Sequence, residues 1–279
     1  MNAVSKKLVP IIASLIVAVL FYACQPNLYR VTNKSYKKQA KAYGKIISQK
    51  TIKDTLDWAT PPKWVGTTNF SLRRPNMVII HHTAQNNCAQ TLQTFTKPSK
   101  SVSAHYVICE DGTVHHMLHD YLRAWHAGTG KWGNNSDINS SSIGIEIDNN
   151  GTETFTEDQM LSLEKLLTHL KTAYKIPQEN VIGHADIAPT RKNDPNVTFD
   201  WQRLSNLGFG MWYSDTTDVQ MPVDFKPLFA LKMIGYDIKD TTAVVRTFKR
   251  KFLKSEDGMP LTSSDKKVLY TLWTEAMKH

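Results

Sequence analysis

Runs of apolar and polar positions in the middle of the chain predict a β-sheet. Residues 77–80 form a continuous apolar run rich in β-branched side chains, which is typical of a buried strand. Residues 142–148 alternate strictly, so their isoleucines share one face while Gly144, Glu146 and Asp148 share the other. Strands are also predicted at residues 104–109 and 114–118, joined as a hairpin across Asp111-Gly112, and at 180–183.

The clearest helical period lies at Glu157–Tyr174. Thr156 and Gln159 form a capping box before it, and apolar residues then recur at the spacing of one buried face. A shorter helix is predicted at Cys88–Phe95. We therefore expect an α/β fold in which helices flank a central mixed sheet, within a domain spanning residues 63–215.

A second apolar pattern follows Pro222 and predicts three short helices, at residues 228–233, 242–252 and 264–277. Each carries apolar residues at core-facing spacing, so residues 222–279 are predicted to form a small helical module with its own core.

The first residues have the pattern of an export signal. Lys6 and Lys7 precede an apolar run at 8–23 that is short for a membrane span, and Cys24 follows it. Residues 1–23 are interpreted as a bacterial lipoprotein-type signal peptide, with Cys24 as the lipidated residue. The alternative is an N-terminal anchor that is not cleaved.

Charge is concentrated close to this signal. The net charge is +9, and residues 25–60 hold eight Lys or Arg against two Asp. Residues 24–62 are predicted to be a basic tether, partly helical at 37–47, which is either a solvated spacer or lies against anionic lipid headgroups. The remaining chain is nearly neutral, which argues against nucleic-acid binding. Cys88 and Cys109 are either a disulfide or two free thiols, and their spacing does not decide.

Candidate chemistry gathers at two strand ends. His184 follows the strand predicted at 180–183 and Asp194 follows ten residues later, while His81 ends the strand that begins at 77. Two imidazoles and one carboxylate are the protein ligands of an open catalytic zinc site. The spacing alone is a weak signal, because a strand-end histidine is often structural. Glu146 strengthens it, since a carboxylate interrupts an otherwise apolar strand.

Five ordered motifs resemble one family, the zinc-dependent N-acetylmuramoyl-L-alanine amidases that share a fold with peptidoglycan recognition proteins, and in particular the bacterial outer-membrane lipoprotein amidases. The matching stretches are Val78-Ile-Ile-His-His-Thr-Ala84, Ser103-Ala-His-Tyr106, Ala124-Trp-His-Ala-Gly128, Ser142-Ile-Gly-Ile-Glu146 and His184-Ala-Asp-Ile-Ala-Pro-Thr-Arg-Lys-Asn-Asp-Pro195.

The resemblance implies roles for individual residues. His81, His184 and Asp194 would bind Zn²⁺, whereas His82 points to the opposite face and Asp186 lies outside the metal shell. Glu146 would be the catalytic carboxylate and Lys192 its basic partner. The resemblance also implies that substrate is contacted by Trp125, His126, Arg191 and His105; for His105 the alternative is a core-facing structural role.

The expected activity is hydrolysis of the amide bond between N-acetylmuramoyl and L-alanine in peptidoglycan or muropeptides. The alternatives are a non-catalytic peptidoglycan-binding protein of the same fold and a zinc peptidase acting on the stem peptide. The module at 222–279 resembles peptidoglycan-binding helical domains. We expect a monomeric lipoprotein of the outer membrane that faces the periplasm.

Overall fold

The computed structural model describes residues 28–48, 67, 69 and 71–278, and the chain divides into two compact units between Phe70 and Ser71. The predicted signal peptide, the lipidation site Cys24 and parts of the tether lie outside the described residues. Within the described ranges, no helix has the length and apolar character needed to cross a membrane.

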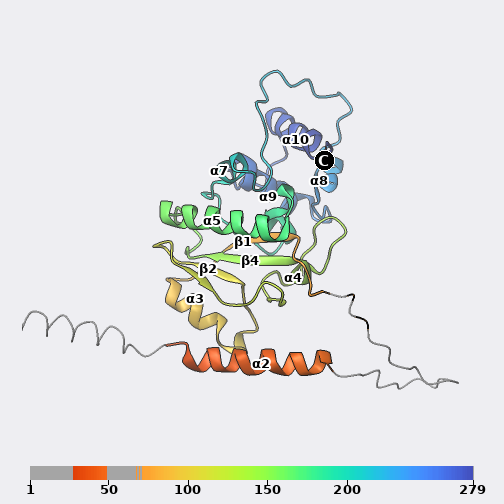
Figure 1. Ribbon diagram of the computed structural model, residues 1–279. Helices are drawn as coiled ribbons and strands as arrows, with labels where there is room; N and C mark the ends of the chain where they lie inside the picture. The colour runs from red at the N-terminus through yellow and green to blue at the C-terminus, as the bar shows by residue number, and fades with distance from the viewer. Residues whose placement is uncertain (1–27, 49–66, 68, 70, 279) are drawn as a thin grey trace, which may run out of the picture. The chain divides into compact units, whose positions relative to one another are not determined.

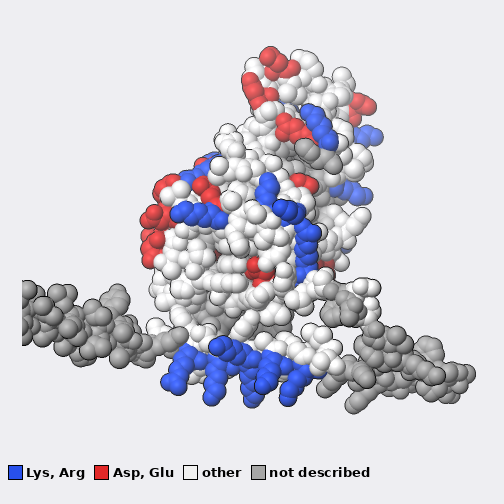
Figure 2. All heavy atoms as spheres, in the orientation of Figure 1, with Lys and Arg blue, Asp and Glu red and all other residues white. Residues whose placement is uncertain are grey.

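The described part of the first unit is one helix, α2 (Arg30–Ser48), which has no buried residues. It confirms the helix predicted in the tether and extends it by several residues at its start. Its charged side chains are all basic, and Figure 2 shows Lys and Arg gathered along it.

The second unit is built on a five-stranded sheet with the order β3-β2-β4-β1-β5 (Figure 1). β2 and β3 form the predicted antiparallel hairpin, and the other neighbours are parallel, so the predicted mixed sheet is confirmed. The strands are β1 (Met77–His82), β2 (Tyr106–Ile108), β3 (Val114–His116), β4 (Ser142–Ile147) and β5 (Val181–Gly183).

The two faces of the sheet bury different partners. The isoleucines of β4 pack with Val78 and Ile80 against the leucines of α5 (Glu157–Tyr174), whose bounds and capping box are those predicted. The opposite face carries Met77 and Ile79, which pack with residues around the end of β5. Strand alternation places His81 and Glu146 on this second face, away from α5.

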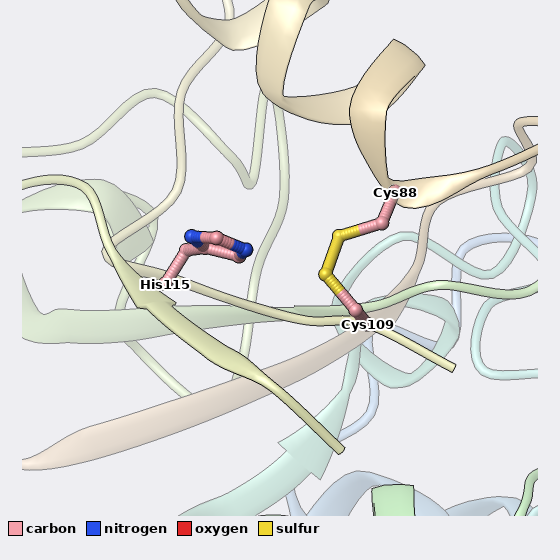
Figure 3. Close-up of side chains that lie close together, drawn as sticks. All are labelled: Cys88, Cys109 and His115. Atoms are coloured by element: carbon pink, nitrogen blue, oxygen red, sulfur yellow. A yellow bond between two sulfur atoms is a disulfide. The ribbon is translucent and has the colours of Figure 1, made fainter. Parts of the chain in front are cut away.

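A disulfide joins Cys88, the first residue of α3 (Cys88–Phe95), to Cys109 at the end of β2 (Figure 3). It settles the question that the sequence left open. His115 lies close to both sulfur atoms, but these are bonded to each other and are not offered to a metal ion.

The three predicted C-terminal helices are present as α8 (Pro227–Ile234), α9 (Thr241–Leu253) and α10 (Ser263–Ala276), around an apolar core of their own. They belong to the same compact unit as the sheet, and α9 contacts α6 (His184–Ile187). Elements that the sequence did not predict are α4 (Ile138–Ser141), α6, α7 (Trp201–Asn206) and the 3₁₀ turns Pro98–Lys100 and Gln178–Asn180.

Candidate metal centre and active site

Two neighbouring parallel strands deliver the two candidate histidine ligands to one edge of the sheet. Ile80 of β1 pairs with Gly183 of β5. The next residues, His81 and His184, are therefore adjacent, although 103 residues separate them in the chain. Asp194 comes from the loop after α6, and its carbonyl accepts a hydrogen bond from Ala185 N–H, which ties this loop back to the helix.

Three atoms with lone pairs converge at this edge. His81 Nδ1 lies 2.9 Å from His184 Nδ1, and each of these atoms lies 3.0 Å from Asp194 Oδ2. A tetrahedral Zn²⁺ with bonds of about 2.0–2.1 Å would separate its ligand atoms by roughly 3.3 Å. The three residues are 1%, 3% and 5% exposed. The group is thus compatible with a metal site, because lone pairs this close repel unless a proton or a cation lies between them.

Hydrogen bonds behind His81 determine which of its ring nitrogens carries the proton. Ser142 Oγ donates to the Ile138 carbonyl at 2.6 Å, so it accepts from His126 Nε2 at 3.2 Å. His126 Nδ1 is then left without a proton and accepts from His81 Nε2 at 3.1 Å. This chain of bonds leaves the His81 Nδ1 lone pair directed at the other two candidate ligands.

His184 is fixed in the same way. Its Nε2 lies 3.0 Å from the Ala127 carbonyl, which can only accept, so Nε2 carries the proton and Nδ1 is free to bind a metal. Both imidazoles therefore present the same atom to the centre and are held from behind by a fixed partner.

Electrostatics matches the protonation states that metal binding requires. Burial and, to a lesser extent, the neighbouring His184 lower the pKa of His81 to about 4, so His81 is neutral near pH 7. Burial opposes ionisation of Asp194, but its close contacts with His184 and His81 outweigh burial and hold the pKa of this carboxyl well below its usual range. A neutral His81 imidazole and an anionic Asp194 carboxylate result.

Glu146 lies beside this group. It is the register partner of His81 on β4, so both side chains leave the same face of the sheet. Burial, together with the nearby Asp194, raises the pKa of Glu146 well above its usual range. Its Oε2 atom is buried and has no hydrogen-bond partner among the residues that the structure describes. It can therefore bond a water or substrate molecule in the cavity.

A cavity of about 330 Å³ opens over these groups. Lys192, Trp125 and Arg191 line it. Lys192 forms no hydrogen bond or ion pair with any described side chain, and Trp125 is 53% exposed. Arg191 donates from Nη2 to the carbonyls of Ala127 and Thr129, so part of its guanidinium is already used by backbone.

The other two predicted substrate contacts are held differently. His126 reaches the cavity wall, but both its ring nitrogens bond to protein, as described above. His105 is absent from the residues lining the cavity: its Nδ1 accepts from Gly144 N–H, and its Nε2 lies 3.0 Å from the Leu122 carbonyl. This placement fits the core-facing alternative for His105. The role of His126 as a substrate contact stays a prediction.

Sequence reasoning did not find the residues that support the two imidazoles, namely Ser142 and the Ala127 carbonyl. One signal was present: Gly144 interrupts the β4 strand, and a Cβ there would lie 2.5 Å from the His126 ring. The glycine leaves the space that this ring occupies. Asp186 lies outside the three-ligand group, as expected, and bonds away from it.

Known proteins with similar sequences share this architecture. Residues 71–197 match the family model described as N-acetylmuramoyl-L-alanine amidase. The chain is 33% identical over 191 residues to the N-acetylmuramoyl-L-alanine amidase AmiD of Escherichia coli, covering 60% of this chain and 68% of AmiD. It is 38% identical over 103 residues to the 1,6-anhydro-N-acetylmuramyl-L-alanine amidase AmpD of Haemophilus influenzae, covering 37% of this chain and 56% of AmpD.

Two solved structures are similar beyond the sheet. One is E. coli AmiD in complex with the substrate anhydro-N-acetylmuramic acid-L-Ala-D-gamma-Glu-L-Lys. Its TM-score is 0.66 at 26% identity, and the match covers 75% of this chain and 93% of the AmiD chain. AmpDH3 of Pseudomonas aeruginosa has a TM-score of 0.65 at 26% identity, and the match covers 79% of this chain and 98% of the AmpDH3 chain. With its sheet, its buried His-His-Asp group and this sequence similarity, the chain belongs to the N-acetylmuramoyl-L-alanine amidase family.

Proposed function

We propose that this protein is a zinc-dependent hydrolase that cleaves the amide bond between N-acetylmuramoyl and L-alanine in peptidoglycan or its muropeptide fragments. One observation carries the proposal: a buried carboxylate with an unbonded oxygen, Glu146, lies in the same cavity as the converging group His81, His184 and Asp194. The amidases E. coli AmiD and H. influenzae AmpD, to which this chain is similar, support the choice of bond.

The three ligand residues would hold Zn²⁺, which supplies Lewis-acid polarisation of the scissile carbonyl and lowers the pKa of a coordinated water towards ~7. Glu146 accepts the proton of the attacking water, for which a carboxyl with a raised pKa is suited, and delivers it to the departing amine of L-alanine. A cation held by the three ligand residues would oppose the effect of burial and favour the ionised form of Glu146. Lys192, at the cavity wall, stabilises negative charge on the carbonyl oxygen.

Substrate binding is assigned to the exposed wall of the cavity. Trp125 offers an apolar ring face to a sugar or to a peptide backbone. Arg191 keeps its other guanidinium nitrogens for a stem-peptide carboxylate, because only Nη2 is bonded to backbone carbonyls. These contacts select a muramoyl peptide over the sugar alone.

We also propose that the protein is an outer-membrane lipoprotein facing the periplasm, anchored through Cys24, which lies outside the described residues. α2 supports this location. At 100° per residue its six cations fall within an arc of about 100°, opposite Tyr36, Tyr43, Ile46 and Ile47. These four side chains are exposed. A helix of this kind reinforces one lipid chain by attraction to anionic headgroups.

The activity is tested by incubating the purified protein with muropeptides and mapping products by mass spectrometry. The expected products are the free sugar and a stem peptide with an L-alanine amino terminus. Cuts further along the peptide would indicate a peptidase instead. Activity that persists after exhaustive chelation, or in His184→Ala, would overturn the proposed mechanism.

A further inference from the structure

The C-terminal helices contact the short helix that carries His184. Asp186, in α6, is 2% exposed and is bonded on every side. Its Oδ2 accepts from Gly183 N–H at 2.8 Å and from Lys251 Nζ at 2.6 Å, and its Oδ1 accepts from the Tyr236 hydroxyl at 2.7 Å. Lys251 lies in α9 and Tyr236 directly after α8, so one carboxylate joins the turn bearing the ligand to two C-terminal elements.

The turn needs this support because it is short. α6 spans four residues, too few for a helix to persist on its own intrahelical bonds. The bond from Gly183 N–H to Asp186 closes the turn around His184. Any movement of Asp186 would therefore move the backbone on which His184 depends, and an imidazole must be held closely to bind a metal.

The Lys251–Asp186 pair is isolated from water, and both side chains are at most 4% exposed. The ammonium group also lies 4.1 Å from the centre of the Trp201 ring, on α7. Removing one partner of a buried pair leaves an unpaired charge in a medium of low dielectric constant, which costs free energy. The surrounding structure must move to reduce this cost. The segment bonded directly to this pair is the Gly183–Asp186 turn, through the bond from Gly183 N–H to the Asp186 carboxylate.

We propose that Lys251 and Tyr236 are positioning residues for the metal centre: through Asp186 they fix the turn that presents His184 Nδ1, so the C-terminal module is a structural part of the zinc site. This inference rests on the proposed function, because it requires that the His-His-Asp group binds Zn²⁺. The resemblance of residues 222–279 to a wall-binding module stays a separate prediction.

The test compares two lysines on one helix in the full chain. Lys249 is 4% exposed and pairs with Asp257 and Asp265, within the C-terminal module. Lys251→Met should weaken Zn²⁺ binding by about 10–100-fold, the size of effect expected when a residue that supports a metal ligand is lost. Lys249→Met should leave Zn²⁺ binding unchanged. Zn²⁺ affinity is measured by competition with a chromophoric chelator, and thermal unfolding of the metal-free proteins reports the stability cost of each change.

Equal Zn²⁺ affinity in wild type and Lys251→Met would overturn the proposal, as would equal weakening in both lysine variants. If Lys251→Met does not fold, Tyr236→Phe, which removes one hydroxyl, is measured in its place. It should weaken Zn²⁺ binding several-fold, and unchanged affinity would count against the proposal. Wild-type protein that binds no Zn²⁺ would instead refute the proposed function, so the two failures are distinct.

Discussion

His81 Nε2 lies 3.1 Å from His126 Nδ1, and this contact sets the protonation of a candidate metal ligand. This series of hydrogen bonds continues from His126 through the Ser142 hydroxyl to a backbone carbonyl, which can only accept. The donor and the acceptor of every bond in the series are therefore determined. His126 is consequently a support for the metal centre, and substitutions that displace its ring should act on metal binding before they act on substrate.

Gly144→Ala provides such a displacement. The added Cβ would lie 2.5 Å from the His126 ring, closer than real contacts allow, so the ring must shift, and we expect the shift to disturb its bond to His81. We expect Zn²⁺ affinity to fall by about 10–100-fold. The measurement is chelator competition, with Gly44→Ala as the control because no atom of the described residues lies within 4 Å of its added Cβ. Unchanged affinity in Gly144→Ala would refute the supporting role of His126.

Glu146→Gln should separate binding from chemistry. The amide retains the size of the carboxylate but cannot accept the proton of water, so kcat should fall by about 10²–10⁴-fold. Zn²⁺ content should stay that of the wild type, since Glu146 is outside the ligand group. Muropeptide hydrolysis and metal analysis on the same preparation check both expectations. A variant with normal kcat would remove Glu146 from the mechanism.

Stability should decrease in mild acid because of His105. Burial, with a smaller contribution from the nearby Arg73, lowers the pKa of His105 from 6.5 to about 4. The folded state therefore disfavours the proton that the unfolded state binds below pH 6.5. Stability is lost as pH falls from 6.5 to 4, by about 3 kcal/mol for this one group.

The comparison is with His105→Asn, whose side-chain oxygen can still accept from Gly144 N–H. Free energies of unfolding are measured by denaturant titration at several pH values. Between pH 6.5 and pH 4, the free energy of unfolding of the wild type should fall by about 3 kcal/mol more than that of the variant. Parallel pH profiles would show that His105 is protonated in the folded protein.

The disulfide should contribute to the stability of the fold where α3 joins the sheet. It closes a separation of 21 residues between Cys88 and Cys109, and the N-terminal end of α3 is held by it. The chain-entropy model gives about 3 kcal/mol for a loop of this length. Replacing both cysteines by serine should lower the free energy of unfolding by this amount. A decrease in the free energy of unfolding of less than about 1 kcal/mol would show that other contacts hold α3 in place.

Elements determined by local chemistry were predictable from the sequence. The bounds of α5 follow from its capping box and from Pro177 beyond it, and those of α3 are equally local. The hairpin was also predicted, but its strands are shorter than the predicted 104–109 and 114–118. The groups expected to carry the chemistry, His81, His184, Asp194 and Glu146, are brought together by the paired strand ends.

Features that depend on distant partners were not predictable. α6 contains Asp186, which is bonded to Lys251, 65 residues away, and a four-residue stretch carries no helical period from which the helix could be predicted. The support of His81 depends on a ring that enters the space above Gly144. The disulfide depends on α3 and the hairpin lying side by side, which spacing alone does not encode.

The central claim is that three side chains from distant parts of the chain hold one divalent cation. Its most direct test is the zinc content of the purified full-length protein after dialysis, measured by mass spectrometry of the metal alongside His184→Ala. The account predicts one tightly held Zn²⁺ per chain in the wild type and loss of that ion in the variant. Substoichiometric zinc in the wild type, or equal zinc in both proteins, would contradict it.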